Sequence, residues 1–245
     1  MLRYNIAVMV MELLEAGARK LGIALSIKQL DQFETFYGEL IEWNSRFNLT
    51  RVSDYPGVQI KHFLDSLTAI LVWQPANEYV LDVGSGAGIP GLPLKIVFPN
   101  IRLALLEATK KKSDFLQHIV SVLGINDIEV IYGRAEEAAH SPLYREKFDV
   151  VLARAVAELP ALVELTLPFC RTGGIFISSK KGDSAGEMKK AQKAIGLLGG
   201  RLKEIKQVEL SEFTDERCLV VIEKISVTPV NYPRRPGMPE KRPIK

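Results

Sequence analysis

The sequence is poor in the residues that build disulfide frameworks and zinc sites. Its 245 residues include two cysteines, Cys170 and Cys218, and three histidines, His62, His118 and His140. Two cysteines cannot form a disulfide framework, no cysteine pair has metal-ligand spacing, and no histidines stand in the H-E-x-x-H pattern. We therefore expect a reducing, cytoplasmic setting, no metal, and a buried core thiol at Cys170.

Long apolar runs are also missing. The longest run near the start, residues 6–11, is stopped by Glu12 and is too short for a signal sequence or a membrane span. With 47% hydrophobic and 25% charged residues, the composition excludes wholesale disorder, collagen and coiled coil. We expect a monomeric protein that does not associate with membranes.

Positive charge is concentrated in one segment. The formal net charge is +3, but residues 226–245 hold five basic residues against Glu240 alone, and five of the 13 prolines. Proline cannot propagate a helix, and the charge suits an acidic partner such as nucleic acid. A solubilising, disordered tail is the alternative that the sequence leaves open.

The hydrophobic pattern divides the chain into three parts. Residues 1–75 form a predicted helical extension, with a capping box at Ser26 and Gln29 and a third helix over 56–72. Residues 76–225 alternate short apolar runs with amphipathic segments, which predicts an α/β domain with a mostly parallel sheet. Residues 226–245 are the basic tail, expected to pack on or near the ligand edge.

Seven strands are expected in the α/β domain. The runs 201–210 and 217–225 are joined by a short polar link, so they can pair only in antiparallel fashion, and the last strand is reversed. Helices are expected near 89–98, 110–123, 157–169 and 184–198. The other predicted strands cover 79–83, 102–106, 128–132, 148–153 and 174–179.

A glycine-rich turn, LDVGSGAGIPG at 81–91, joins the first strand to the first helix of this domain. Gly84, Gly86 and Gly88 permit positive φ and let a ligand approach the backbone. We expect free N–H groups there, at the carboxyl edge of the sheet where ligands of open α/β folds bind.

Three interpretations of this turn compete. Gly86, Gly88 and Gly91 match G-x-G-x-x-G, and Glu107 follows Gly86 by 21 residues, as in dinucleotide-binding folds. However, an acid two residues before three alternating glycines, here Asp82, is typical of S-adenosylmethionine enzymes, and no Tyr is followed four residues later by Lys. The methyl donor is therefore favoured over a dinucleotide and over a purely structural turn.

The donor's chemistry indicates further contacts. Glu107, at the tip of the second strand, can accept from the ribose hydroxyls, and Glu136, after the third strand, can meet the edge of the adenine. Asp82 is suited to hold the turn or the donor's amino group. Glu107 or Glu136, taken alone, would more often be a solvated charge in a loop.

Several segments resemble one known family. In order they are WNSRFNLT at 43–50, KHFLDSL at 61–67, LDVGSGAGIPGLPL at 81–94, LLEATKKK at 105–112, GRAEE at 133–137, ARAVA at 153–157 and YPRRPGMPEKRP at 232–243. From about Leu13 to the C-terminus the chain resembles the glucose-inhibited division protein B family. The resemblance implies a Rossmann-like class I S-adenosylmethionine-dependent methyltransferase that modifies a guanine N7 in the 530-loop region of 16S ribosomal RNA, free or in a small ribosomal subunit particle.

The resemblance also implies site residues. It assigns to the donor site Gly84, Ile89, Glu107, Ala108, Thr109, Ala135, Glu136 and Arg154. The glycine turn itself adds Asp82, Ser85, Gly86 and Gly88. Arg154, beyond the fourth strand, faces either solvent at a helix start or donor and substrate, and the resemblance favours the second.

Guanine N7 has an in-plane lone pair and no hydrogen, so no general base is required and positioning must carry catalysis. Paired A-form RNA hides N7, so the target must be exposed. The predicted RNA contacts are Arg46, Asn48, Arg51, Lys61, His62, Lys180, Lys181, Arg234 and Arg235.

A polar network of Asn44, Asn48, His62 and Asp65 that braces the helical extension is a further possibility, and helix capping explains these residues nearly as well.

Two alternatives to RNA methylation stay open. One keeps the donor but acts on a protein or a small molecule. The other is a nonenzymatic, donor-sensing RNA-binding protein.

Overall fold

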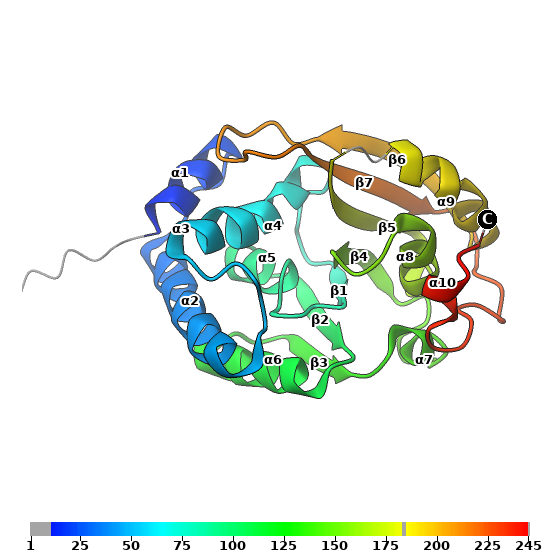
Figure 1. Ribbon diagram of the computed structural model, residues 1–245, viewed down its shortest axis with the longest axis horizontal. Coiled ribbons are helices and arrows are strands. Elements are labelled where there is room, and N and C mark those ends of the chain that lie inside the picture. The colour runs from blue at the N-terminus through cyan, green and yellow to red at the C-terminus, as the bar shows by residue number, and fades with distance from the viewer. Residues whose placement is uncertain (1–10, 183–184, 245) are drawn as a thin grey trace, which may run out of the picture.

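A single seven-stranded sheet forms the centre of the molecule (Figure 1). The computed structural model describes residues 11–182 and 185–244. The strand order is β3-β2-β1-β4-β5-β7-β6; β1 to β5 are parallel, and β7 is antiparallel to both its neighbours. The strands are β1 Tyr79–Val83, β2 Arg102–Glu107, β3 Ile128–Tyr132, β4 Phe148–Arg154, β5 Cys170–Lys181, β6 Gly200–Gln207 and β7 Arg217–Lys224. The prediction of a mostly parallel sheet with a reversed last strand is confirmed.

Helices cover both faces of the sheet (Figure 1). Helices α5 (Gly91–Val97) and α6 (Lys110–Leu123) lie on one face, and α7 (Ala135–Ala138), α8 (Leu159–Thr166) and α9 (Ala185–Leu197) on the other. Alternate strand residues therefore enter two separate cores, Leu103 and Leu105 on the α5 side and Ala104 and Leu106 on the α8 side. Burial on both faces explains why the parallel strands are near-continuous apolar runs.

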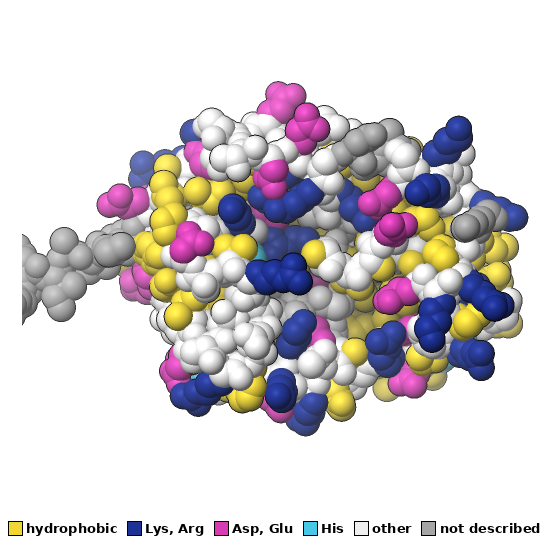
Figure 2. Space-filling model, in the orientation of Figure 1, with side chains coloured by type: hydrophobic (Ala, Val, Ile, Leu, Met, Phe, Trp, Pro, Cys, Tyr) yellow, Lys and Arg dark blue, Asp and Glu magenta, His cyan; other side chains and the backbone are white. Residues whose placement is uncertain are grey.

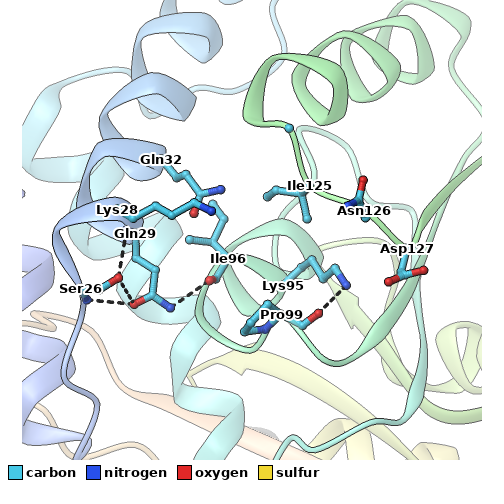
Figure 3. Close-up of a pocket in the computed structure, with 11 residues that line it drawn as sticks. Ser26, Lys28, Gln29, Gln32, Lys95, Ile96, Pro99, Ile125, Asn126 and Asp127 are labelled. Carbon is cyan, nitrogen blue, oxygen red and sulfur yellow. Dashed lines mark hydrogen bonds between the residues drawn. The ribbon is translucent and has the colours of Figure 1, made fainter.

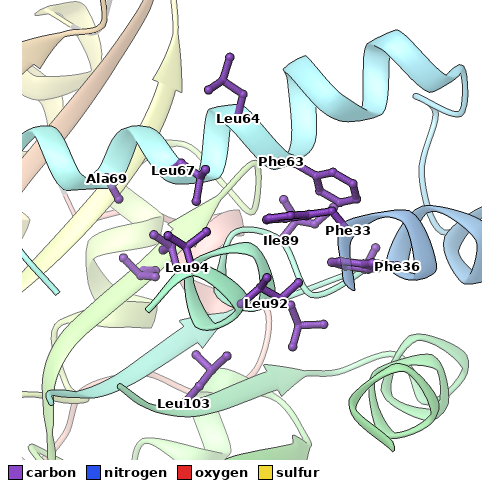
Figure 4. Close-up of a cluster of buried hydrophobic side chains, with 14 of the residues drawn as sticks. Phe33, Phe36, Phe63, Leu64, Leu67, Ala69, Ile89, Leu92, Leu94 and Leu103 are labelled. Atoms are coloured by element: carbon purple, nitrogen blue, oxygen red, sulfur yellow. The ribbon is translucent and has the colours of Figure 1, made fainter. Parts of the chain in front are cut away.

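The helical extension shares the core on the α5 side. It comprises α1 (Glu12–Lys20), α2 (Ile27–Phe47) and one helical segment made of α3 (Tyr55–Val58), the π-helix η1 (Gln59–Leu64), α4 (Asp65–Leu67) and the 3₁₀-helix η2 (Thr68–Leu71). The predicted capping box at Ser26 and Gln29 starts α2. The rings of Phe33 and Phe63 lie 4.9 Å apart and pack towards Leu92 of α5 (Figure 4). This packing holds residues 55–71 on the face of the sheet that α5 and α6 cover.

The basic tail packs along α7 and α8, so the alternative of a disordered tail is wrong for residues 226–244. The guanidinium of Arg145 donates to the carbonyl of Tyr232 at 2.8 Å, and Ile244 is buried in the core. A short helix, α10 (Met238–Lys241), lies beside α8 (Figure 1). The tail is therefore part of the fold.

Arg234 has a structural partner. Its guanidinium and backbone N–H donate to the carboxylate of Glu164, which is fully buried in α8. Arg234 therefore has a structural role that the sequence did not reveal, and the RNA contact predicted for it stays a prediction.

Replacing Arg234 with alanine should therefore lower the free energy of unfolding by about 3 kcal/mol, because a buried carboxylate loses its partner. Urea denaturation measures this loss. Arg235→Ala, at the exposed neighbouring residue, is the matched control and should change stability by less than about 0.5 kcal/mol. Equal effects of the two variants would contradict the anchoring role.

Both cysteines are buried. Burial raises the pKa of Cys170 to about 12, so its thiol stays protonated at neutral pH. The prediction of a buried core thiol is confirmed.

Candidate active site

The glycine turn between β1 and α5 is built as predicted in its backbone angles but not in its hydrogen bonding. Gly84, Gly86 and Gly88 have φ of 70°, 59° and 81°. The amides of Gly84 and Ser85 donate to the carbonyl of Leu106, and those of Gly88 and Ile89 donate to the carbonyl of Ser85. The expectation of free N–H groups is therefore wrong for these four amides, which hold the turn together.

What the turn offers a ligand is open backbone surface. Gly84 and Gly86 are half-buried, whereas Gly88 and Ile89 are buried behind them. A Cβ on Gly84 would lie 2.7 Å from a methyl group of Val156, in the loop after β4. Glycine at position 84 therefore makes room for the side chain of Val156, and a Cβ on Gly86 would meet only the carbonyl oxygen of Gly84 at 3.9 Å. We call the partly exposed backbone of Gly84 and Gly86, at the end of β1, the glycine shelf.

Glu107 at the end of β2 ties the turn to the next loop. Its Oε2 accepts from the amide of Gly86 at 2.9 Å and its Oε1 from the amide of Thr109 at 2.7 Å. Each carboxylate oxygen has two lone pairs, so both can still accept from a ligand hydroxyl. Ala108 and Thr109, beside it, are exposed. The carboxylate is thus fixed beside the glycine shelf, and its contact with a ribose stays a prediction.

Asp82 and Ser85 support the turn from inside. Asp82 is fully buried; its Oδ2 accepts from the amide of Gly91 at 2.9 Å, and the Oγ of Ser85 donates to the carbonyl of Asp82. Burial raises the pKa of Asp82 to about 7. Of the two roles predicted for Asp82, the structure has the one that holds the turn, and Ser85 is corrected from a donor contact to the same role.

A small hollow of about 80 Å³ lies beside the shelf, between the ends of β1, β2 and β3. Glu136 lies at its edge and is 3% exposed, with its carboxylate accepting from the guanidinium of Arg134 and from the amide of Gly237 at 2.8 Å. Although burial alone would raise it, these donors hold the pKa of Glu136 below its ordinary value. The remaining lining residues are Val83, Gly84, Leu106, Ala108, Gly133, Ala135, Val156, Leu165 and Glu240.

Arg154, the last residue of β4, connects the sheet to the helical extension. Its guanidinium donates to the carbonyl of Lys61 at 2.8 Å, to Oδ2 of Asp65 at 2.6 Å and to Nδ1 of His62 at 3.1 Å. Two of these three partners, Lys61 and His62, belong to the π-helix η1. A π-helix is a rare helix form that often occurs at functional sites. Ala155, the next residue, has φ of 55°, a left-handed conformation that non-glycine residues seldom adopt.

The polar network predicted for the extension is present, with changes in its membership. Nε2 of His62 lies 2.8 Å from the hydroxyl of Thr50, whose amide donates to the side chain of Asn44. Asn48 instead ends α2 in a left-handed conformation. The network therefore runs from α2 through His62 to the tip of β4.

Sequence analysis missed Arg217. This residue at the start of β7 is 4% exposed, and its guanidinium donates to Oδ1 of Asp65 and to Asp215. Asp65 thus bridges two arginines from different strands. The signal that could have found it was an arginine at the edge of the otherwise apolar run 218–222.

A basic cleft of about 640 Å³ opens between η1 and the ends of β4 and β5. Figure 2 shows Lys and Arg side chains around the hollow in the middle of this face. Lys180 is paired with Glu187 at 2.8 Å, and Lys181 with Asp215 at 2.8 Å. Of the predicted RNA contacts, the cleft brings together Arg51, Lys61, His62, Lys180 and Lys181; Arg46, Asn48, Arg234 and Arg235 are not part of its lining.

His62 is neutral in the network. Burial, followed by the charge of Arg154, lowers its pKa to about 4. Nδ1 lies 3.1 Å from the guanidinium of Arg154 and 3.1 Å from the carbonyl of Lys61, and Nε2 lies 2.8 Å from the hydroxyl of Thr50, so both ring nitrogens have protein partners. His62 lines the cleft and is 7% exposed, and the RNA contact predicted for it stays a prediction.

The pKa of His62 gives a pH dependence of stability. Because the folded-state pKa is below the unfolded value of about 6.5, the contribution is full above pH 6.5 and is lost as pH falls to 4, an expected loss of about 3 kcal/mol. Denaturation curves of wild type and His62→Gln should therefore converge by this amount between pH 7 and pH 4. His140→Gln, at an exposed histidine, is the control; a pH-independent difference for His62→Gln would refute the assignment.

Another hollow, of about 420 Å³, lies at the opposite edge of the sheet, where β2 and β3 begin (Figure 3). The ammonium of Lys95 is 1% exposed there and donates to the carbonyls of Pro99 and Ile101. The amide of Gln29 donates to the carbonyl of Ile96 at 3.0 Å. These bonds close the loop after α5, and the hollow contains none of the predicted site residues.

Residues 11–182 and 185–244 contain no group of three or more His, Cys, Asp or Glu side chains placed to hold a metal ion. Within the same ranges, no helix combines the length and the apolar character that crossing a membrane requires.

The sheet order, the reversed β7 and the glycine shelf beside an acid at the end of β2 define a class I methyltransferase. Two solved structures share the fold: a putative O-methyltransferase from Klebsiella pneumoniae has a TM-score of 0.56 at 15% identity, covering 86% of this chain and 96% of that one. A predicted O-methyltransferase from Agrobacterium tumefaciens has a TM-score of 0.54 at 20% identity, covering 66% and 81%.

Sequence comparison gives the family. The family model GidB, described as rRNA small subunit methyltransferase G, matches residues 29–217. A ribosomal RNA small subunit methyltransferase G from Dehalococcoides mccartyi (strain CBDB1) is 54% identical over 93% of this chain and 97% of its own length, and one from Roseiflexus sp. (strain RS-1) is 45% identical over 96% and 100%. The chain belongs to this family, and the resemblance found in the sequence is confirmed.

Proposed function

We propose that this protein transfers the methyl group of S-adenosylmethionine to N7 of a guanine in the 530-loop region of 16S ribosomal RNA. One observation carries the proposal: three consecutive residues, from the last residue of β4 into the following loop, border two adjoining sites. Arg154 and Ala155 line the basic cleft, and Val156 lines the hollow beside the glycine shelf. A donor held in one site would present its methyl group to a base held in the other.

The residues on the donor side fit the chemistry of S-adenosylmethionine. The shelf at Gly84 and Gly86 admits a chain close to the backbone, and Glu107 has lone pairs for the ribose hydroxyls. The hollow beside Ala108 and Ala135 offers an apolar slot for the adenine, with Glu136 at its edge. The donor supplies an activated methyl group on a sulfonium; the protein supplies position.

The absence of a general base in the proposal agrees with the network around the cleft. His62 has both nitrogens occupied, and Asp65 is held by two arginines. These contacts orient the groups towards one another, and the proposal assigns neither of them a proton to remove. Guanine N7 needs no general base, because its lone pair lies in the plane of the ring.

The cleft also fits RNA better than a small neutral substrate. Three exposed cations, Arg51, Lys61 and Lys181, belong to its lining. Cations at a concave surface bind phosphates of the strand that carries an exposed base. Arg46, Asn48, Arg234 and Arg235 remain proposed contacts outside the cleft.

The test is methyl transfer from labelled S-adenosylmethionine to protein-free small-subunit ribosomal RNA and to purified small subunits, with mapping of the modified base. Label at a guanine N7 supports the proposal. Label only on protein or small molecules would favour the first alternative. Tight donor binding with RNA affinity but without transfer would favour the donor-sensing alternative.

A further inference from the structure

A second basic surface lies beside the cleft. A groove of about 730 Å³ runs between the start of α8 and α9 and ends against the tail. We call it the α9 groove. Its lining residues are Glu158, Pro160, Lys189, Lys190, Gln192, Lys193 and Pro243.

The lysines of the α9 groove lack the ion pairs within the helix that three other exposed helical cations make. Arg19, Arg46 and Lys110 each pair with an acid four residues away on the same helix. Lys189 and Lys193 instead place two like charges at i and i+4. No ion pair joins either of them to a carboxylate within residues 11–182 and 185–244.

Such a pair destabilises an isolated helix by about 0.2–0.5 kcal/mol. Lys190 adds a third exposed cation beside them, and the only acid in the lining is Glu158. The arrangement therefore lowers local stability and concentrates positive charge along a concave surface. Binding of an external polyanion would relieve the repulsion between these lysines, and this relief would contribute to the binding affinity.

The position of the α9 groove indicates which polyanion. The amide of Leu159 donates to Glu187 at 2.9 Å, so the first turns of α8 and α9 meet at one point. Glu187 lines the basic cleft on one side of that point, and Glu158 and Pro160 line the groove on the other. An RNA strand that leaves the cleft over the loop 155–158 would enter the groove directly. In Figure 2, further Lys and Arg side chains gather over α8, α9 and α10.

We propose that the α9 groove binds the phosphates of RNA flanking the target nucleotide, as a contact site separate from the basic cleft. This inference rests on the proposed function and adds Lys189, Lys190 and Lys193 to the RNA-binding surface. The groove raises affinity without touching the reacting atoms. Its loss should therefore change RNA binding and leave methyl transfer from the bound state unaltered.

The test compares two triple variants of equal charge change. K189Q/K190Q/K193Q removes the lysines of the groove; K28Q/K147Q/K203Q removes three exposed lysines elsewhere, two of them at the opposite edge of the sheet. Affinity for small-subunit ribosomal RNA is measured between 50 and 200 mM salt. The slope of log K against log salt should fall by up to about 2 for the groove variant, at about 0.7 per lost phosphate contact. Its affinity should fall about tenfold.

Two further measurements separate this loss from misfolding or from a failed function. S-adenosylmethionine affinity and the single-turnover rate at saturating RNA should match wild type in both variants. If the groove variant keeps the salt slope of the control, the groove proposal is overturned while wild-type methylation still supports the function. If only binding to the small subunit weakens, and not binding to protein-free RNA, the groove contacts a ribosomal protein and the RNA proposal is wrong. Wild type that neither binds nor methylates RNA would instead refute the function itself.

Discussion

Replacing Glu107 with alanine is expected to weaken S-adenosylmethionine binding by at least a hundredfold. The carboxylate holds the amides of Gly86 and Thr109 and, in the proposed complex, the ribose hydroxyls. Hydrogen bonds to a charged group are each worth about 1.5–3 kcal/mol, so losing the ribose contacts and loosening both loops removes about 3 kcal/mol or more of binding. Isothermal titration of the purified protein measures this change.

Two controls make the Glu107 result specific. Glu107→Gln keeps an oxygen that can accept one hydrogen bond and should lose only about tenfold, since one charged contact is worth about 1.5 kcal/mol. Glu137→Ala, at an exposed acid of the nearby helix α7, should bind the donor as wild type does. Thermal unfolding without donor reports any general loss of structure. Wild-type donor affinity in Glu107→Ala would remove the acid from the donor site.

The sequence predicted the edge of the sheet where the site lies, because strand ends follow directly from the alternation of apolar runs and turns. It located the glycine turn, Glu107, Glu136 and Arg154, which all stand at the carboxyl ends of β1 to β4. Parallel strands bring such ends together whatever the details of packing. The local sequence pattern was therefore sufficient to predict which edge of the sheet carries these residues.

What the sequence could not predict depends on contacts between distant segments. Arg217 reaches Asp65 across 152 positions, and Arg234 reaches Glu164 across 70. No periodicity carries that information, so Arg217 and the structural role of Arg234 were missed. The amides of the turn were expected to be free because nothing in the chain shows that the carbonyl of Leu106, on the next strand, accepts two of them.

Arg154→Ala is expected to lower the single-turnover rate of methyl transfer about a hundredfold while the protein stays folded. The guanidinium is 17% exposed, lines the cleft and locks the tip of β4 to η1, so its loss would shift the boundary between donor and target. Misplacing reacting groups by about 1 Å costs about a hundredfold in rate. The fold should survive because Asp65 keeps its ion pair with Arg217.

A control variant and a conservative variant test whether this prediction is specific to the Arg154 guanidinium. Arg171→Ala removes an exposed arginine paired with Asp149 at the other end of the sheet and should leave the rate unchanged. Arg154→Lys keeps the charge, but its single nitrogen cannot reproduce the planar fork of the guanidinium, so it should restore only part of the rate. An unaltered single-turnover rate in Arg154→Ala would rule out the positioning role.

Asp65→Asn distinguishes a positioned arginine from one that acts alone. If Asp65 affects the rate only by holding Arg154, the double variant should be no slower than Arg154→Ala, because Arg154 is already absent when Asp65 is changed. Independent roles would instead make the two losses multiply. Single-turnover rates of the four proteins give this coupling directly. Stability, measured in parallel, should fall more in Asp65→Asn than in Arg154→Ala, since only the former leaves the nearly inaccessible guanidinium of Arg217 without the Asp65 charge.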